Sequence, residues 1–369
     1  MEHLFTQYIK DILAKQFDKQ ADAIFTKSPI LQYLNIKTKS AQRGSKSRAS
    51  FANLYAIYVL VEDYINEGYL CSGNYAKYEG ALFTDLLKRT RELPFGAKLQ
   101  NHALNSRMNE EFKKYFPECE SAPIIRDLQN NRYWINEYLL KIKIGRKTYN
   151  IAKSIINIID EYARVKSESF QRFIEQCQEL ENIENKDVKK IKNFIISLLA
   201  PNVDARLFEI VSFSILKYYY KDEKIYWGYS LEDINEDYLR LYKTGRTNAN
   251  DGGIDFVMKP LGRFFQVTET LDFKKYFLDI DKIERYPITF VVKSEDEDGV
   301  LRAKLKESAK KTYSVETIVD KYLASIEELI NIPKLKSIFE SLCAQGNLSF
   351  ILREILLQSK VEFNYDDDE

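Results

Sequence analysis

The chain has 369 residues, of which 55 are basic, 55 are acidic and 45% are hydrophobic. This length is enough for roughly two or three domains, each with a core of its own. The balanced charge excludes a protein that coats nucleic acid or membrane by bulk charge, so any polyanion must meet locally segregated charge. Two histidines exclude a histidine-rich metal site, and four widely spaced cysteines without a CxxC pair indicate neither a zinc site nor a disulfide framework.

The N-terminal segment is amphipathic and carries charges of both signs, so it does not resemble a secretory signal. No window of the sequence reaches the roughly 18 apolar residues that are needed to span a bilayer. We therefore expect a cytoplasmic protein with no membrane partner, in a compartment that keeps its cysteines reduced.

The N-terminal half is helical in pattern. Residues 50–67 place apolar side chains on one stripe at three- and four-residue spacing, and residues 151–165 and 169–183 repeat this pattern. The polar, charged stretch at 184–190 predicts a boundary. We expect a helical DNA-recognition region over residues 1–185.

The pattern changes after Pro201, which ends a helix. The next elements predict an α-β-β-β-α-β order, and hence a mixed α/β core over residues 186–300. A C-terminal helical extension with an acidic tail follows over residues 301–369. The core elements are a helix at 204–220, strands at 224–230, 253–259 and 263–270, a helix at 271–286 and a strand at 287–293, with a Pro-Leu-Gly turn joining the second and third strands into a hairpin.

Three polar side chains interrupt segments of this core that are otherwise apolar: Glu209, Asp255 and Gln266. A buried carboxylate costs free energy unless it is paired or binds a cation. Strand alternation places Gln266 and Thr268 on one face, which hairpin pairing can bring alongside Asp255. Hard oxygen ligands of this kind suit Mg²⁺, so the sequence predicts a magnesium site at these three residues.

The element order, the segment Gly252-Gly253-Ile254-Asp255 and the Gln266-Val267 pair after an apolar residue resemble the PD-(D/E)XK nuclease superfamily. The resemblance covers about residues 204–293 and is to the variant with glutamine in place of the second acid. It implies that Asp255 is the metal-binding acid, Gln266 the (D/E) position and Glu209 the acid of the first helix. A helical region before a single nuclease core is most similar to type II restriction endonucleases.

The chain departs from the family pattern at Thr268, where the resemblance implies a lysine that positions the attacking water and steadies the phosphate charge. Three explanations remain open. A lysine can reach in from elsewhere, either Lys259 on the second strand or Lys274 or Lys275 at the start of the next helix. Thr268 can hold the water by a hydrogen bond, or the site can be inactive.

Local positive charge lies in two segments that predict DNA contacts. Residues 37–50 form a basic, serine-rich loop that can bind phosphates, and the loop before Asp255 can read bases, since arginine pairs with guanine and asparagine with adenine. A solvated loop and simple turn geometry are the alternatives, and residues 98–107 and 126–134 are weaker candidates. The expected DNA-binding residues are Arg43, Lys46, Arg48, Arg246, Asn248 and Asn250, with Lys37, Lys39 and Lys243 in the same two segments.

The residues and the resemblance together predict a Mg²⁺-dependent type II restriction endonuclease. It would cut double-stranded DNA at a specific, palindromic sequence and leave 5′-phosphate ends. Cutting both strands of a palindrome needs two-fold symmetry, so we expect a homodimer, and a DNA methyltransferase as the genetic partner. The alternatives are a structure- or damage-specific repair or junction nuclease with the same core, and a catalytically inactive DNA-binding protein.

Overall fold

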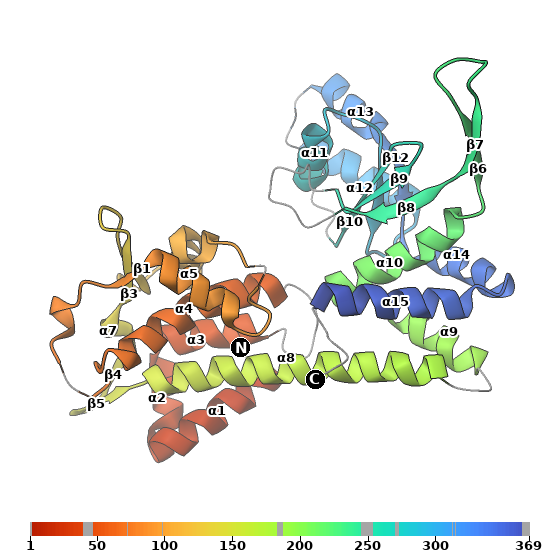
Figure 1. Ribbon diagram of the computed structural model, residues 1–369. Coiled ribbons are helices and arrows are strands. Elements are labelled where there is room, and N and C mark those ends of the chain that lie inside the picture. The colour runs from red at the N-terminus through yellow and green to blue at the C-terminus, as the bar shows by residue number, and fades with distance from the viewer. Residues whose placement is uncertain are drawn as a thin grey trace. The chain divides into compact units, whose positions relative to one another are not determined.

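The computed structural model describes residues 2–39, 47–71, 73–97, 99–182, 187–244, 254–269, 273–311, 313 and 315–363. The chain divides into two compact units, Met1–Arg172 and Phe173–Glu369, which we describe separately (Figure 1). The division falls inside a helix, upstream of the boundary predicted at 184–190. Both helices and strands are present, which confirms the mixed α/β class.

The first unit is built mainly of helices that enclose one apolar core. Helix α3 shows how local sequence sets a helix start, because Ser28 accepts a hydrogen bond from the Leu31 N–H and Pro29 occupies the first turn. The helices are α1 (Leu4–Phe17), α2 (Ala21–Lys27), α3 (Pro29–Thr38), α4 (Ser47–Asn66), α5 (Phe83–Glu92), α6 (Met108–Tyr115), α7 (Glu137–Leu140) and α8 (Ala152–Asn182), which runs into the second unit.

The first unit also contains short strands that the sequence did not predict. Each spans two to four residues, which is too short for an alternating pattern to stand out from helical spacing. They form a three-stranded sheet in the order β1-β3-β2 and a separate hairpin β4-β5. The strands are β1 (Ala81–Leu82), β2 (Ile124–Asp127), β3 (Arg132–Ile135), β4 (Lys141–Ile144) and β5 (Lys147–Asn150).

Helix α8 is continuous over 31 residues, where the sequence predicted two helices, at 151–165 and 169–183. No proline or glycine lies between the two apolar stripes. Arg164 spans the junction, with ion pairs to Glu161 and Glu168 one turn away on either side. Pairs at this spacing stabilise a helix, so the predicted break does not form.

The second unit is organised around a five-stranded sheet in the order β12-β11-β10-β9-β8. Strands β8, β9 and β10 are antiparallel neighbours, and β10, β11 and β12 are parallel. Parallel neighbours need a crossover, which α11 (Phe273–Lys282) supplies after β10 and α12 (Asp298–Lys310) and α13 (Glu316–Ala324) supply after β11. The strands are β8 (Arg240–Lys243), β9 (Phe256–Lys259), β10 (Arg263–Thr268), β11 (Ile288–Val292) and β12 (Ile326–Ile330).

Helices cover both faces of this sheet (Figure 1). On one face, α10 (Ala205–Tyr220) packs Phe213 against Phe256, with ring centroids 5.3 Å apart, and is itself packed against α14 (Ile332–Ala344) and α15 (Leu348–Phe363). On the other face Tyr276 of α11 lies 4.4 Å from Phe290. Helix α9 (Val188–Ser197) packs on α15.

Two features of the sheet differ from the predicted element order. The segment at 224–230, expected as its first strand, forms β6 (Lys224–Trp227), which pairs with β7 (Asn235–Tyr238) in a separate hairpin. Strand β8 takes this place in the sheet. It is an edge strand in which only Leu241 is buried, so the sequence shows no strand pattern there. Strand β12 lies in the segment expected to be only helical, so residues 301–369 contribute to the same sheet.

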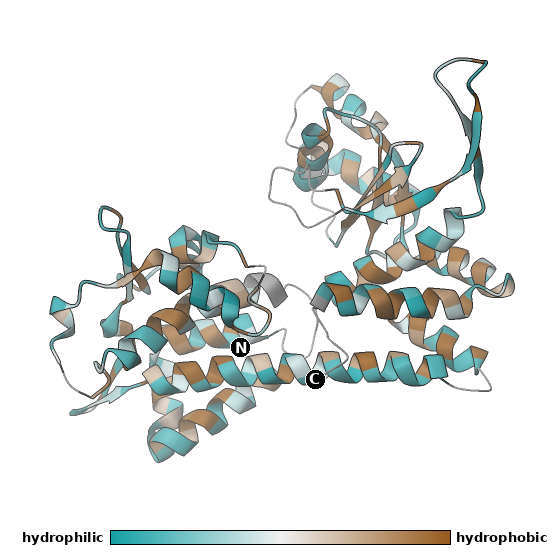
Figure 2. Ribbon diagram, in the orientation of Figure 1, coloured by the Kyte–Doolittle hydropathy of each residue, from teal (hydrophilic) through white to brown (hydrophobic). Residues whose placement is uncertain are grey.

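The hydropathy of the elements follows this arrangement (Figure 2). Helices α10 and α15 and the strands of the sheet carry many apolar residues, whereas the β6-β7 hairpin is largely hydrophilic in colour. In the described part of the chain no helix combines the length and apolarity needed to cross a bilayer.

Candidate metal centre

Strand ends bring polar side chains to one edge of the five-stranded sheet. Strand β8 ends at Lys243, Asp255 immediately precedes β9, β10 ends at Thr268, and Lys293 follows β11. Because β9 is antiparallel to both β8 and β10, and β11 is parallel to β10, these four positions coincide at the same edge. We call this row of strand ends the Asp255 edge, which is distinct from the outer strands of the sheet.

Asp255 is attached to β10 on both sides of Gln266. Its backbone N–H donates to the Phe265 carbonyl at 3.0 Å, and its Oδ2 accepts a hydrogen bond from the Val267 N–H at 2.7 Å. Its own carbonyl accepts from the Thr244 N–H at 3.0 Å, which links it to the end of β8. The carboxylate is therefore held in one orientation next to Gln266.

The environment of Asp255 disfavours its charged form. Burial, followed by repulsion from Glu209, raises the pKa of Asp255 to about 7. The hydrogen bond from Val267 and the positive charges of Arg206 and Lys275 act in the opposite direction. A carboxyl group that titrates near neutral pH beside a second acid is typical of functional sites.

Gln266 carries an acceptor that the surrounding chain leaves unused. The residue is 8% exposed and lies beside Phe290 in the β10–β11 ladder. Its Nε2 donates to the Val267 carbonyl at 3.3 Å, while its Oε1 is buried without a hydrogen-bond partner among the described residues. A buried acceptor left unpaired costs roughly 1–3 kcal/mol, so this oxygen is suited to an external cation or donor.

Glu209 reaches the same edge from α10. Asp204 starts the helix by accepting hydrogen bonds from the N–H groups of Arg206, at 2.7 Å, and Leu207, at 3.3 Å. Glu209 follows one turn later, is 8% exposed, and pairs with Arg206 and with Lys243, whose Nζ lies 3.4 Å from Oε1. Glu209 is thus a paired acid, close enough to Asp255 to raise the pKa of that group.

Among the candidate lysines, the structure brings Lys275 to the site. Its Nζ lies 3.5 Å from the Oγ1 of Thr268, which is buried, and its charge lowers the pKa of Asp255. Lys259 is instead exposed at the opposite end of β9, with its Nζ 5.5 Å from the centre of the Tyr242 ring. The catalytic role predicted for Lys259 therefore has no geometric support.

The sequence did not single out Lys293, which is the most deeply buried cation at this edge. Its side chain is 3% exposed, donates to the Val203 carbonyl and pairs with Glu269 Oε1 at 2.7 Å. Its backbone N–H donates to the Thr268 carbonyl at 2.9 Å. These contacts join the segment before α10 to the ends of β10 and β11. A lysine directly after a strand that is apolar except for Thr289 was the available signal.

Most of the predicted DNA-binding residues fall outside the described part of the chain. This applies to Arg43, Lys46, Arg246, Asn248 and Asn250, and to the side chain of Arg48 at the start of α4. These assignments remain predictions.

Of the other basic candidates, Lys37 pairs with Glu111 at 2.7 Å within the first unit, so it is not an unpaired phosphate ligand. At the β2–β3 turn, Asp127 accepts hydrogen bonds from the backbone of Gln129 and Asn130, which is turn geometry.

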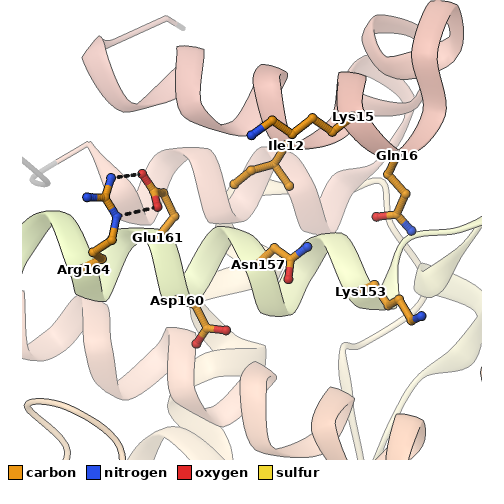
Figure 3. A pocket seen from close by; sticks show the side chains of 8 residues that line it. All are labelled: Ile12, Lys15, Gln16, Lys153, Asn157, Asp160, Glu161 and Arg164. Carbon is orange, nitrogen blue, oxygen red and sulfur yellow. Dashed lines mark hydrogen bonds and ion pairs between the residues drawn. The ribbon is translucent and has the colours of Figure 1, made fainter.

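The first unit contains a hollow of about 760 Å³ between α1 and α8 (Figure 3). Charges of both signs line it, and Glu161 and Arg164 pair with each other on its wall. None of the predicted site residues contributes to this hollow. Its lining residues are Ile12, Lys15, Gln16, Lys153, Asn157, Asp160, Glu161 and Arg164.

The described residues contain no group of three or more His, Cys, Asp or Glu side chains that could hold a metal ion. The predicted magnesium ligands are the carboxylates of Asp255 and Glu209 and the amide of Gln266, so they do not form a group of that kind. No family model, curated protein or solved structure matches the chain. The functional argument therefore depends on the geometry of the Asp255 edge.

Proposed function

We propose that the protein is a Mg²⁺-dependent type II restriction endonuclease that hydrolyses phosphodiester bonds in double-stranded DNA at a specific sequence. One observation carries the proposal: the buried Oε1 of Gln266 has no partner among the described residues, and the Asp255 carboxylate is bound to the backbone of the next residue, Val267. A hard divalent cation would satisfy this oxygen and offset the repulsion between Asp255 and Glu209.

The topology of the second unit supports the proposal. If the separate β6-β7 hairpin is left aside, helix α10, strands β8, β9 and β10, helix α11 and strand β11 have the α-β-β-β-α-β order that the resemblance implies. Asp255 stands at the start of the second of these sheet strands, and Gln266 lies in the third. These strand positions are consistent with the nuclease motif and so support the proposal.

The donor atoms present fit a magnesium ion, which takes one or two carboxylates together with other oxygens. Asp255 and Gln266 would hold it, with Glu209 assisting through a water molecule. When bound, Mg²⁺ supplies positive charge that orients a water and stabilises the charge that builds on the phosphate. The hydrogen bond from Val267 fixes the direction in which Asp255 presents its carboxylate.

Lys275 and Thr268 would share the work that the resemblance assigns to the motif lysine. The Lys275 ammonium group lies next to the Thr268 hydroxyl, so it can place positive charge beside a bound phosphate. The hydroxyl can accept a hydrogen bond from the attacking water or donate one to it. In-line attack by that water would leave 5′-phosphate and 3′-hydroxyl ends. A homodimer, a partner methyltransferase and a cytoplasmic location belong to the same proposal.

The direct test is to incubate the purified protein and Mg²⁺ with a long DNA of mixed sequence. We expect discrete fragments with 5′-phosphate ends. Asp255→Asn should abolish cleavage, while Asp320→Asn, a matched change at an exposed ion pair with Lys306, should not. A smear, or cutting of branched DNA alone, would instead support the structure-specific nuclease, and no hydrolysis of any DNA would refute the proposal.

A specific observation favours a second candidate, a catalytically inactive DNA-binding protein. Thr268 replaces the motif lysine, and Glu209 is already paired with Arg206 and Lys243. In that case DNA binding would persist without cleavage, and Mg²⁺ would leave the thermal stability of the free protein unchanged. Stabilisation by Mg²⁺ that disappears in Asp255→Asn would exclude this second candidate.

A further inference from the structure

The hairpin β6-β7 exposes several large aromatic and aliphatic side chains between its polar residues, outside the core of the second unit. It forms a two-stranded sheet of its own, and neither strand pairs with another strand in the part of the chain that the structure describes. An isolated hairpin is at best marginally stable in water. Large apolar side chains are nevertheless exposed along it and at its tip: Tyr226 is 64% exposed, Trp227 40%, Tyr229 94%, Leu231 85% and Ile234 53%.

We propose that this hairpin is the surface through which two copies of the chain associate. The inference deepens the proposed function. Its consequence for double-strand cleavage rests on that function, because cutting both strands needs two active sites. The surface itself is defined by exposure, charge and strand pairing, which do not depend on the chemistry at the Asp255 edge.

The charge of the hairpin argues against nucleic acid as its partner. Residues 224–238 contain four acids, Glu232, Asp233, Glu236 and Asp237, against the single basic residue Lys224. Lys224 is already neutralised by Glu236, at 2.6 Å. A net negative arm would be repelled by the phosphates of DNA and by an anionic membrane, so its apolar side chains fit a protein surface.

The exposed area matches what a dimer needs. Large side chains offer roughly 150–250 Å² each when fully exposed, and these five are 40–94% exposed. Together they offer on the order of 700 Å², somewhat less than the ~800 Å² per partner of a standard interface. Trp227 and Tyr229 already contact each other edge to face, with centroids 6.3 Å apart. Such large, rigid side chains lose little conformational freedom when they become buried.

The two strands of the hairpin differ in charge, and this difference favours pairing of two copies through β6. Antiparallel self-pairing of β7 would set Glu236 and Asp237 against the same acids of a second copy. Self-pairing of β6 about Ile225 or Tyr226 sets no like charges opposite each other, because Lys224 then faces Tyr226 or Gly228 of the second copy. The Leu239 N–H donates to the Glu223 carbonyl at 2.9 Å, so by ladder alternation the backbone groups of Lys224 and Tyr226 point to the outer side.

The mass of the full-length protein in solution tests this inference. The variant is Tyr229→Ser with Leu231→Ser, and the control is Leu128→Ser, which alters a leucine that is 70% exposed at the tip of the β2–β3 hairpin in the other unit. We expect the mass of two chains for the wild type and the control. The double variant should have the mass of one chain, with unchanged circular dichroism. A monomeric wild type, or a double variant that remains dimeric, would overturn the inference.

Cleavage of a supercoiled plasmid separates this inference from the proposed function. If both hold, the wild type produces linear DNA, whereas the double variant accumulates nicked circles because single sites act independently. If the wild type is a dimer through the hairpin but no variant cuts DNA, the interface stands and the nuclease proposal fails. Linear DNA produced by a monomeric double variant at the wild-type rate would count against the role of the hairpin in double-strand cleavage.

Discussion

The two edges of the five-stranded sheet both carry charge, but they differ in how completely that charge is satisfied. We call the opposite row of strand ends the Arg263 edge. There, Arg263 starts β10 and pairs with Glu327, at 3.0 Å, and with Glu328. It also donates to the Thr289 hydroxyl at 3.1 Å, and its guanidinium group lies 5.7 Å from the Tyr220 ring centre. Lys334 also pairs with Glu328, so two cations compensate the two acids of this network.

At the Asp255 edge, Glu209 is paired with Arg206 and Lys243, but one repulsion and one acceptor remain. Two acids, Asp255 and Glu209, repel each other, and the Gln266 Oε1 is buried without a partner in the described structure. Helix α10 reaches both edges, with Glu209 near its start and Tyr220 at its end. The comparison teaches that charge at a strand end is not by itself a sign of function, because the charges of the opposite edge are closed in ion pairs.

The largest expected effect is at Asp255. Asp255→Asn should reduce the rate of DNA cleavage at least ~10³-fold, because a Lewis-acid metal contributes several kcal/mol to the transition state. The measurement is the single-turnover cleavage rate, with circular dichroism as the check on folding. Wild-type cleavage by this variant would show that the Asp255 edge is no more functional than the Arg263 edge.

The next effect concerns the lysine that the structure favours. Lys275→Met should slow cleavage by about 10²-fold, since it removes the positive charge next to Thr268. Lys259→Met is the matched control and should cut at the wild-type rate. If Lys259→Met slows cleavage and Lys275→Met does not, Lys259 is the functional lysine. The thermal shift produced by Mg²⁺ should persist in both.

Changing the opposite edge should affect stability instead of the metal response. Arg263→Met removes the cation of Glu327 and leaves Glu328 only Lys334, so we expect a loss of roughly 2–3 kcal/mol, or 30- to 150-fold in the unfolding equilibrium. The control Arg302→Met breaks an exposed pair with Asp298 and should cost no more than about 1 kcal/mol. Urea unfolding with and without Mg²⁺ measures both. An Mg²⁺ response lost in Arg263→Met would erase the distinction between the edges.

The smallest effect is on pH dependence. Since the pKa of Asp255 is raised to about 7, the folded protein retains a proton that the unfolded chain releases near pH 4. Without metal, this group should therefore lower stability as pH rises from about 4 to about 7. Mg²⁺ must displace the same proton, so its apparent affinity should rise about tenfold per pH unit up to about 7 and then level off.

Thermal shifts with Mg²⁺ at a series of pH values measure this dependence. Asp255→Asn supplies the control, because it has no proton to release and should show no such rise. An equal shift at every pH in the wild-type protein would mean that Asp255 does not contact the ion.

Part of the second unit could be predicted from sequence because its signals are strong and local. The apolar run of α10, the Pro-Leu-Gly turn between β9 and β10, and the fully buried strand β11 were located to within a few residues. Asp255 and Gln266 were chosen as candidates because a polar residue inside an apolar run conflicts with burial. Pairing of neighbouring strands then limits where the two side chains can lie.

The rest depended on tertiary contacts that periodicity does not encode. Strand β8 is an edge strand with a single buried residue, and β12 contains two glutamates, so neither reads as a strand. The choice of Lys275 over Lys259 depends on the path of the chain between β10 and α11. The pairing of Lys293 with Glu269 joins ends of strands that only the folded sheet brings together.

The most direct test of the central claim is calorimetric titration of Mg²⁺ into the full-length wild-type protein, Asp255→Asn and the control Asp320→Asn. We expect one saturable site per chain in the wild type and in the control, and none in Asp255→Asn. Absence of binding to the wild-type protein, or equal binding by Asp255→Asn, would contradict the assignment of a metal ion to the Asp255 edge.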